Sequence, residues 1–421
     1  MKRLTQLDGI RGEAVLAVVL FHLELLFGSG AANSLYLNAE HDILFTGWLG
    51  VDVFFVLSGF LITRILLEGR SKPDYWSAFY SRRAFRILPP FIVVFVATLL
   101  GAHFIAPDHH ISPGFVFAAT FFMANWTAVS KNDMLSLTHL WTLAVEEQFY
   151  LLWPQVVRRL TTPTLFRLTL VLAAGSGILR LTLVVLHVDA SIIYRITPTH
   201  IDGLAIGAAL SAGMTLLPVR LFLTHWWKQT SLFTGAMLPL AFLMLRGNLS
   251  LWNGWSQVLA IPLVSILTAM LIYGVVESAL PATLARFLGN PAMTYLGRRS
   301  YALYLIHMPV FVAAAKGRDH GILRLLPHGF GETAILGLLA VAASLILAEL
   351  SWRTIEAPAQ ELRRRWMRPG KKPVRGIEPA ASNEVWQLDT TASDARQFGA
   401  SSKFEDYHRS AKSRKVRTGS N

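Results

Sequence analysis

Long apolar runs recur along most of this chain, separated by shorter polar or basic segments. A run of about 20 apolar residues can cross the hydrocarbon core of a bilayer as a helix. Runs near this length occur at residues 10–27, 44–67, 87–106, 138–157, 166–187, 199–219, 231–246, 256–278, 300–316 and 334–355. The pattern predicts an all-α polytopic membrane protein with about ten transmembrane helices. A further apolar piece, 115–126, is too short to cross, and we expect it to be re-entrant or interfacial.

Composition and charge support this interpretation and orient the chain. Of the 421 residues, 53% are hydrophobic and 15% are charged, and the charged share is below the average for soluble domains. The net charge is +13. With the N-terminus inside, fifteen basic residues fall in the inner segments before the C-terminal tail and five in the outer ones, in accord with the positive-inside rule. We therefore expect an integral protein of the cytoplasmic membrane with both termini cytoplasmic, in contact with membrane lipids and without a nucleic-acid partner.

The character of the chain changes near its C-terminus. Residues 1–358 carry the apolar runs and are expected to form one membrane domain. Residues 359–421 are polar and basic and have no periodic apolar pattern, so we expect a disordered cytoplasmic tail. The chain has no cysteine, which excludes disulfides, thiolate metal sites and cysteine nucleophiles. No metal is expected.

An arginine and a histidine share one face of the first apolar run. Arg11 and His22 are eleven residues apart, close to three turns of an α-helix, and therefore about 16 Å apart along its axis. Arg11 is expected near one membrane surface and His22 near mid-depth. An ionisable residue inside a membrane helix is costly to bury, and such a residue is a functional-site hypothesis by default. A histidine at that depth can act as a general base on a hydroxyl.

Further ionisable side chains lie inside three other runs. They are His139, Glu146, Glu147, His200, Asp202 and His307. Each one alone is explained equally well by a structural hydrogen bond or ion pair, but their joint occurrence favours a functional site in a central polar cavity. Arg83 and Arg86 precede the third run and suit a phosphate-bearing ligand, because guanidinium binds phosphate bidentately. From spacing alone, an ordinary positive inner flank explains these two arginines better.

Five stretches, in order along the chain, resemble the acyltransferase-3 family of integral membrane acyltransferases. They are Leu7–His22, Gly50–Thr63, Ser81–Pro90, His139–Pro154 and Leu296–Pro309. One such stretch would be weak evidence, but five in order are specific. The resemblance covers essentially all of residues 5–358 and points to the type of member that O-acetylates extracytoplasmic glycans.

The resemblance also implies roles for particular residues. It implies an essential pair on the first helix, here Arg11 and His22, and an Arg-x-x-Arg element at the inner face, here Arg83 and Arg86. The second pair would bind the phosphates of the acyl donor. An important glutamate of the family maps to Glu146, which we expect to orient or charge a histidine, as carboxylates do at other acyl-transfer sites. His22 would serve either as general base on the acceptor hydroxyl or as a relay of the acyl group, and the sequence leaves both open.

The expected activity follows from the same resemblance. The family takes an acyl group, most often acetyl, from cytoplasmic acyl-coenzyme A and passes it to a hydroxyl of an extracytoplasmic or lipid-linked carbohydrate. Some members carry a fused extracytoplasmic esterase-like domain. Here a basic tail ends the sequence instead, so a second transfer step would need a separate extracytoplasmic partner protein.

Two other functions compete with this one. Intramembrane His and Glu also form proton relays, so the main alternative is a proton-coupled transporter or exporter of an acylated product. Transporter folds commonly contain structural repeats, and the sequence shows no internal repeat. An inactive scaffold or sensor is disfavoured because the whole set of family residues is present.

Overall fold

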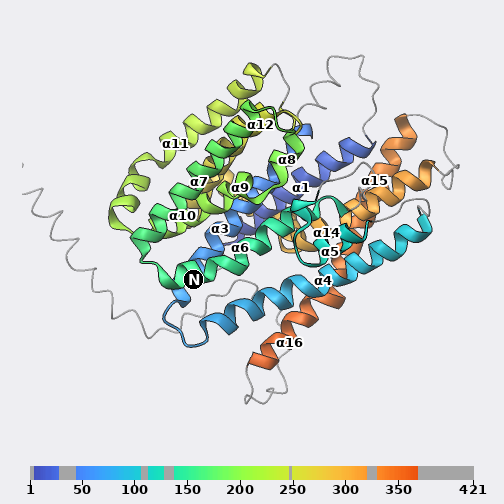
Figure 1. Cartoon of the computed structure of the whole chain (residues 1–421), viewed down its shortest axis with the longest axis horizontal. Helices are drawn as coiled ribbons and strands as arrows, with labels where there is room; N and C mark the ends of the chain where they lie inside the picture. The colour runs from blue at the N-terminus through green and yellow to red at the C-terminus, as the bar shows by residue number, and fades with distance from the viewer. Residues whose placement is uncertain are drawn as a thin grey trace, which may run out of the picture. The chain divides into compact units, whose positions relative to one another are not determined.

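The computed structural model describes residues 4–27, 44–105, 112–127, 137–245, 249–319 and 330–367, and all regular secondary structure in these ranges is helical (Figure 1). The elements are α1 (Thr5–Phe27), η1 (Thr46–Leu49), α3 (Gly50–Gly69), α4 (Tyr75–Ile105), α5 (Pro113–Thr120), η2 (Ala124–Trp126), α6 (Leu140–Arg159), α7 (Thr162–Val185), α8 (Ala190–Arg195), α9 (Thr197–His200), α10 (Asp202–Gly213), α11 (Leu217–Met244), α12 (Gly254–Val276), α13 (Ala282–Leu288), α14 (Pro291–Asp319), α15 (Phe330–Ser351), η4 (Trp352–Glu356) and α16 (Ala357–Met367).

The apolar helices make the chain a helical membrane protein. Five segments of the described residues are long and apolar enough to cross a bilayer: Thr46–Gly69, Tyr75–Ala102, Thr162–Val185, Gly254–Val276 and Glu332–Met367. Helices α10 and α11 taken together are long and apolar enough to form a sixth such segment, with a bend of 112° between them. Helices α1, α6 and α14 are not among these segments; they carry several ionisable residues each, and all three line the site described below. Every expected run coincides with a helix, while the count of ten spans stays a prediction.

The sixth and seventh expected runs differ in detail from the structure. Residues 220–230, expected as an inner loop, belong to α11, which begins at Leu217. Pro218 lies in the first turn of α11 and Leu216 is extended. Proline suits the first turn of a helix, where its missing N–H would have no partner in any case, so a new helix begins directly after the extended Leu216.

The short apolar piece at 115–126 does not form a spanning helix. It contains α5, of eight residues, and the 3₁₀ turn η2. Between them Phe122 has a φ of 55°, in the left-handed region that few non-glycine residues adopt. The Gln148 side chain on α6 donates to the Phe122 carbonyl at 2.9 Å and to Asn125 Oδ1 at 2.8 Å. The N–H groups of Phe122 and Met123 donate to carbonyls of α5, and the Gln148 amide supplies a partner for the Phe122 carbonyl, so the loop backbone is satisfied as a bilayer requires.

The beginning of the expected tail is ordered. Residues 359–367 belong to α16, which packs against α4, and the rings of Phe85 and Trp366 lie 6.2 Å apart. Residues 368–421 lie outside the described part of the chain. The division into a membrane domain and a tail at residue 358 therefore stays a prediction.

Close helix contacts are made at glycines. A Cβ built on Gly207 of α10 would lie 2.0 Å from the Val56 carbonyl oxygen of α3, and one on Gly59 would lie 2.0 Å from the Leu204 carbonyl oxygen. Neither position has room for a larger residue. The two backbones touch, as expected for a stripe of small residues on a membrane helix.

Candidate active site

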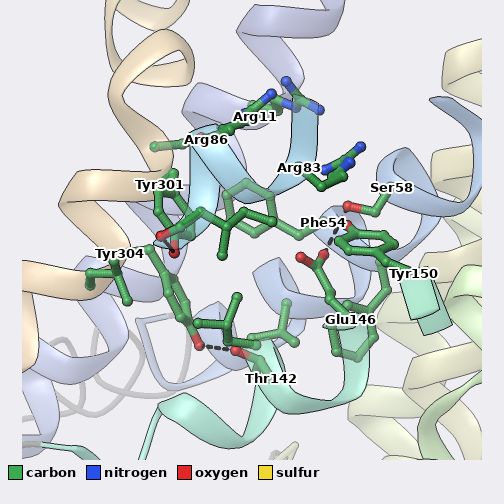
Figure 2. Close-up of a pocket in the computed structure, with 16 residues that line it drawn as sticks. Arg11, Phe54, Ser58, Arg83, Arg86, Thr142, Glu146, Tyr150, Tyr301 and Tyr304 are labelled. Atoms are coloured by element: carbon green, nitrogen blue, oxygen red, sulfur yellow. Dashed lines mark hydrogen bonds between the residues drawn. The ribbon is translucent and has the colours of Figure 1, made fainter. Parts of the chain in front are cut away.

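One cavity lies where α1, α3, α4, α6 and α14 converge (Figure 2). Its volume is about 80 Å³, enough for several water molecules. Four of the five residues expected at the site line it: Arg11, Arg83, Arg86 and Glu146. They come from three helices that are far apart in the sequence. The fifth, His22, lies outside the lining.

The three arginines gather at one end of the cavity (Figure 2). Arg83 and Arg86 are three residues apart on α4 and so share a helix face. Arg11 projects from α1 and is 8% exposed. The Arg83 guanidinium carbon lies 4.4 Å from the centroid of the Tyr150 ring, a cation–π contact that holds it in place. Three positive charges at one end of a cavity make it a suitable place for a polyanion.

Glu146 faces the cavity opposite the arginines (Figure 2). It accepts a hydrogen bond of 2.8 Å from the Ser58 hydroxyl. Among the described residues it has no hydrogen bond to a histidine, so the expected orientation of a histidine by Glu146 is not seen. The reason is the direction of α6: its Glu146 turn faces Ser58 of α3, while His139 lies at the N-cap of the helix, about two turns before Glu146. Glu147 is not part of the lining.

His22 belongs to a cluster of three histidines. Its Nδ1 lies 3.2 Å from Nε2 of His307 on α14, and the rings of His139 and His307 are 5.4 Å apart. Tyr304 connects this cluster to the cavity. Its ring is 5.3 Å from His139 and 5.6 Å from His307, it lines the cavity, and its hydroxyl is 2.7 Å from that of Thr142. Arg11 and His22 therefore lie on one helix as predicted, with Arg11 in the cavity and His22 in the adjoining cluster.

The sequence profile of the acyltransferase domain family, acyltransferase-3, matches residues 4–349. That range contains every residue of the cavity and of the histidine cluster. The chain belongs to the acyltransferase-3 family. The resemblance inferred from five short stretches is thus confirmed over nearly the whole described structure.

Individual relatives are more distant. The peptidoglycan O-acetyltransferase OatA of Listeria monocytogenes is 28% identical over 379 residues, which cover 86% of this chain and 56% of that protein. The O-acetyltransferase OatA of Staphylococcus aureus strain NCTC 8325 is 27% identical over 382 residues, or 84% of this chain and 57% of that protein. The chain thus spans little more than half the length of these relatives. No solved structure matches it.

The structure also adds neutral residues that the sequence reasoning did not single out. Ser58, Thr142, Tyr150, Tyr301 and Tyr304 all line the cavity. The charge pattern does not mark them, because none of them carries a charge inside the apolar runs. Each lies within one of the five stretches that carry the family resemblance, and that was the available signal.

His200 and Asp202 lie in a separate polar cluster. His200 Nε2 contacts Asp52 Oδ1 at 3.0 Å, and Arg180 donates to Asp202 Oδ2 at 2.6 Å and to the Thr199 carbonyl. All of these side chains are almost fully buried, and none lines the cavity. The structural explanation, an internally paired cluster, therefore applies to these residues.

Proposed function

We propose that this protein is a membrane O-acyltransferase that moves an acyl group, acetyl in the first instance, from cytoplasmic acyl-coenzyme A to a hydroxyl of an extracytoplasmic or lipid-linked carbohydrate. One observation carries the proposal: three arginines and a glutamate from α1, α4 and α6 meet in one cavity beside a histidine cluster. Family membership and the O-acetyltransferase names of the relatives support the reaction class.

The donor is held at its phosphates. Arg83, Arg86 and Arg11 supply guanidinium groups for the phosphates of coenzyme A, each able to bind bidentately. These arginines lie towards the end of α1 expected at the cytoplasmic surface, where the donor is made. An extended pantetheine arm running along α1 from Arg11 would bring the thioester about 16 Å deeper, to the level of His22.

The chemical step transfers the acyl group from the sulfur of coenzyme A to the oxygen of the acceptor hydroxyl. His22 takes the proton of the acceptor hydroxyl, and the oxygen attacks the thioester carbonyl carbon. The carbon–sulfur bond then breaks, and the coenzyme A thiolate receives the proton from the His22 imidazolium, which returns the histidine to its neutral form. In the relay version, His22 first accepts the acyl group and releases coenzyme A, and the acceptor hydroxyl removes the acyl group in a second step. Ping-pong kinetics distinguish the relay from direct transfer.

The proposed setting is the cytoplasmic membrane, with ten spans and both termini inside. The proposed acceptor class is supported by the relatives, one of which is a peptidoglycan O-acetyltransferase. We further propose that an extracytoplasmic partner protein takes part in a second transfer step.

A coenzyme A release assay tests the proposal. Purified protein in liposomes is given acetyl-coenzyme A, with and without peptidoglycan fragments, polysaccharides or lipid-linked sugars. We expect release of free thiol that depends on one acceptor class, together with the acetylated acceptor detected by mass spectrometry. Proton or product flux through the liposome membrane without thiol release would support the transporter instead.

A further inference from the structure

Both ring nitrogens of His307 have hydrogen-bond partners within the structure. Its side chain is fully buried on α14. Its Nδ1 lies 2.7 Å from the Tyr304 carbonyl oxygen and 3.1 Å from the Leu303 carbonyl oxygen. A carbonyl oxygen only accepts hydrogen bonds, so Nδ1 of His307 must carry the hydrogen. In the neutral ring the other nitrogen, Nε2, then holds a lone pair.

That lone pair determines which nitrogen of His22 is free. His22 Nδ1 lies 3.2 Å from His307 Nε2 and 3.0 Å from the Val18 carbonyl oxygen. Both neighbours are acceptors, so His22 Nδ1 is the donor and His22 Nε2 carries the lone pair. Nε2 has no hydrogen bond to any residue in the described ranges. It is the one nitrogen of His22 able to take a proton or an acyl group.

The packing of α1 against α14 fixes this pair of rings. A Cβ built on Gly297 of α14 would lie 1.8 Å from the Asp8 carbonyl oxygen and 3.1 Å from the Gly12 nitrogen of α1, so the two backbones touch there. His22 lies ten residues beyond Gly12, and His307 lies ten residues beyond Gly297. The helices run in the same direction with equal rise, so contact at the glycines brings the histidines level.

We propose that His307 is the positioning residue of His22. It accepts the His22 Nδ1–H bond, holds the plane of the ring and directs Nε2 to the reacting groups. When His22 takes a proton, the same hydrogen bond becomes charge-assisted and stabilises the imidazolium. The sequence had predicted this role, the orientation of a histidine, for Glu146. The inference rests on the proposed function of His22.

Two substitutions of matched size test by enzyme kinetics whether His307 acts as a hydrogen-bond acceptor. His307→Leu fills the space without an acceptor, whereas the carboxamide oxygen of His307→Gln can still accept from His22. We expect kcat of the leucine variant to fall roughly a hundredfold with an unchanged KM for acyl-coenzyme A. The glutamine variant should stay within roughly tenfold of wild type. Wild-type kcat in the leucine variant, or equal losses in both variants, would overturn the proposal, since equal losses indicate a packing role alone.

Nitrogen NMR tests the hydrogen bond without any activity. Wild-type protein labelled with ¹⁵N-histidine is compared with a His22→Gln sample to assign the His22 signals. We expect a protonated Nδ1 and an unprotonated Nε2. A His22 protonated at Nε2 refutes the inference even if the leucine variant fails to insert. If this tautomer is found and His22→Ala remains active, the proposed function fails while the geometry stands.

Discussion

Two groups of buried ionisable side chains lie inside this protein, and they differ in how their charges are balanced. In one, Arg180 is paired with Asp202 at 2.6 Å and His200 with Asp52 at 3.0 Å. We call this the paired cluster. Each charged group lies beside a group that can carry the opposite charge, and the two pairs connect α7, α9, α10 and α3. One buried polar atom of each of the four side chains has no hydrogen-bond partner among the described residues. A buried arginine with a carboxylate beside it needs no further ligand.

The cavity of the candidate active site, which we call the arginine cavity, has a different balance of charges. Arg11, Arg83 and Arg86 line it together with one carboxylate, Glu146, and that carboxylate accepts a hydrogen bond from Ser58. Positive charge accumulated around an open space favours an anionic ligand. The comparison shows that burial of a charge identifies no site. An excess of one sign among the side chains that line a cavity is a better indicator, because it favours a ligand of opposite charge.

The largest expected effect lies beside the arginine cavity, at the first helix. His22→Ala and Arg11→Ala should each abolish acyl transfer, with a loss of about 10²–10⁴-fold if the histidine is the general base. Purified variants are assayed for thiol release and acceptor modification at equal amounts of inserted protein. His225→Ala, at an exposed position of α11, is the matched control and should keep wild-type activity. Near wild-type transfer by either well-inserted variant would contradict the assignment.

A substitution in the paired cluster should lower the stability of the protein without changing its catalytic rate. Asp202→Ala leaves the Arg180 guanidinium, 1% exposed, buried without its carboxylate. Removing one partner of a buried pair costs about 3–5 kcal/mol. We expect a lower unfolding temperature in detergent and near wild-type kcat for the protein that remains folded. The double change Arg180→Met with Asp202→Leu should recover much of the stability, since it removes both charges. A loss of kcat at normal stability would make the paired cluster part of the site.

The donor arginines should affect binding of one substrate only. Arg83→Ala with Arg86→Ala removes two guanidinium groups from the cavity, and we expect a weakening of about 3 kcal/mol, or roughly a hundredfold in the KM for acyl-coenzyme A. The KM for the acceptor should stay near its wild-type value. Replacing both arginines by lysine keeps the charge but loses the bidentate geometry, so an intermediate KM is expected. An effect confined to the acceptor would refute the role.

The smallest expected effect concerns the C-terminal residues. A truncation after Arg368 keeps α16 and its contact with α4, and every residue of the cavity lies upstream. The truncated protein should insert normally and retain its specific activity in liposomes. An inserted but inactive truncation at saturating donor and acceptor would show that the tail takes part in catalysis.

The sequence by itself determined the helices and the four charged residues that line the cavity. Apolar runs specify membrane helices because backbone hydrogen bonds must be made within each segment. The spacing of Arg11 and His22 fixed their common face, which is a local property of one helix. The five family stretches located Arg83, Arg86 and Glu146, all of which line the cavity.

The tertiary structure decided which faces meet. Periodicity places a side chain on one side of its own helix but does not say which distant helix lies opposite. That is why Glu146 faces the arginines and Ser58, and why His307 lies beside His22. For the two histidines, close packing at Gly12 and Gly297 sets the register of two helices whose residues are almost 300 positions apart.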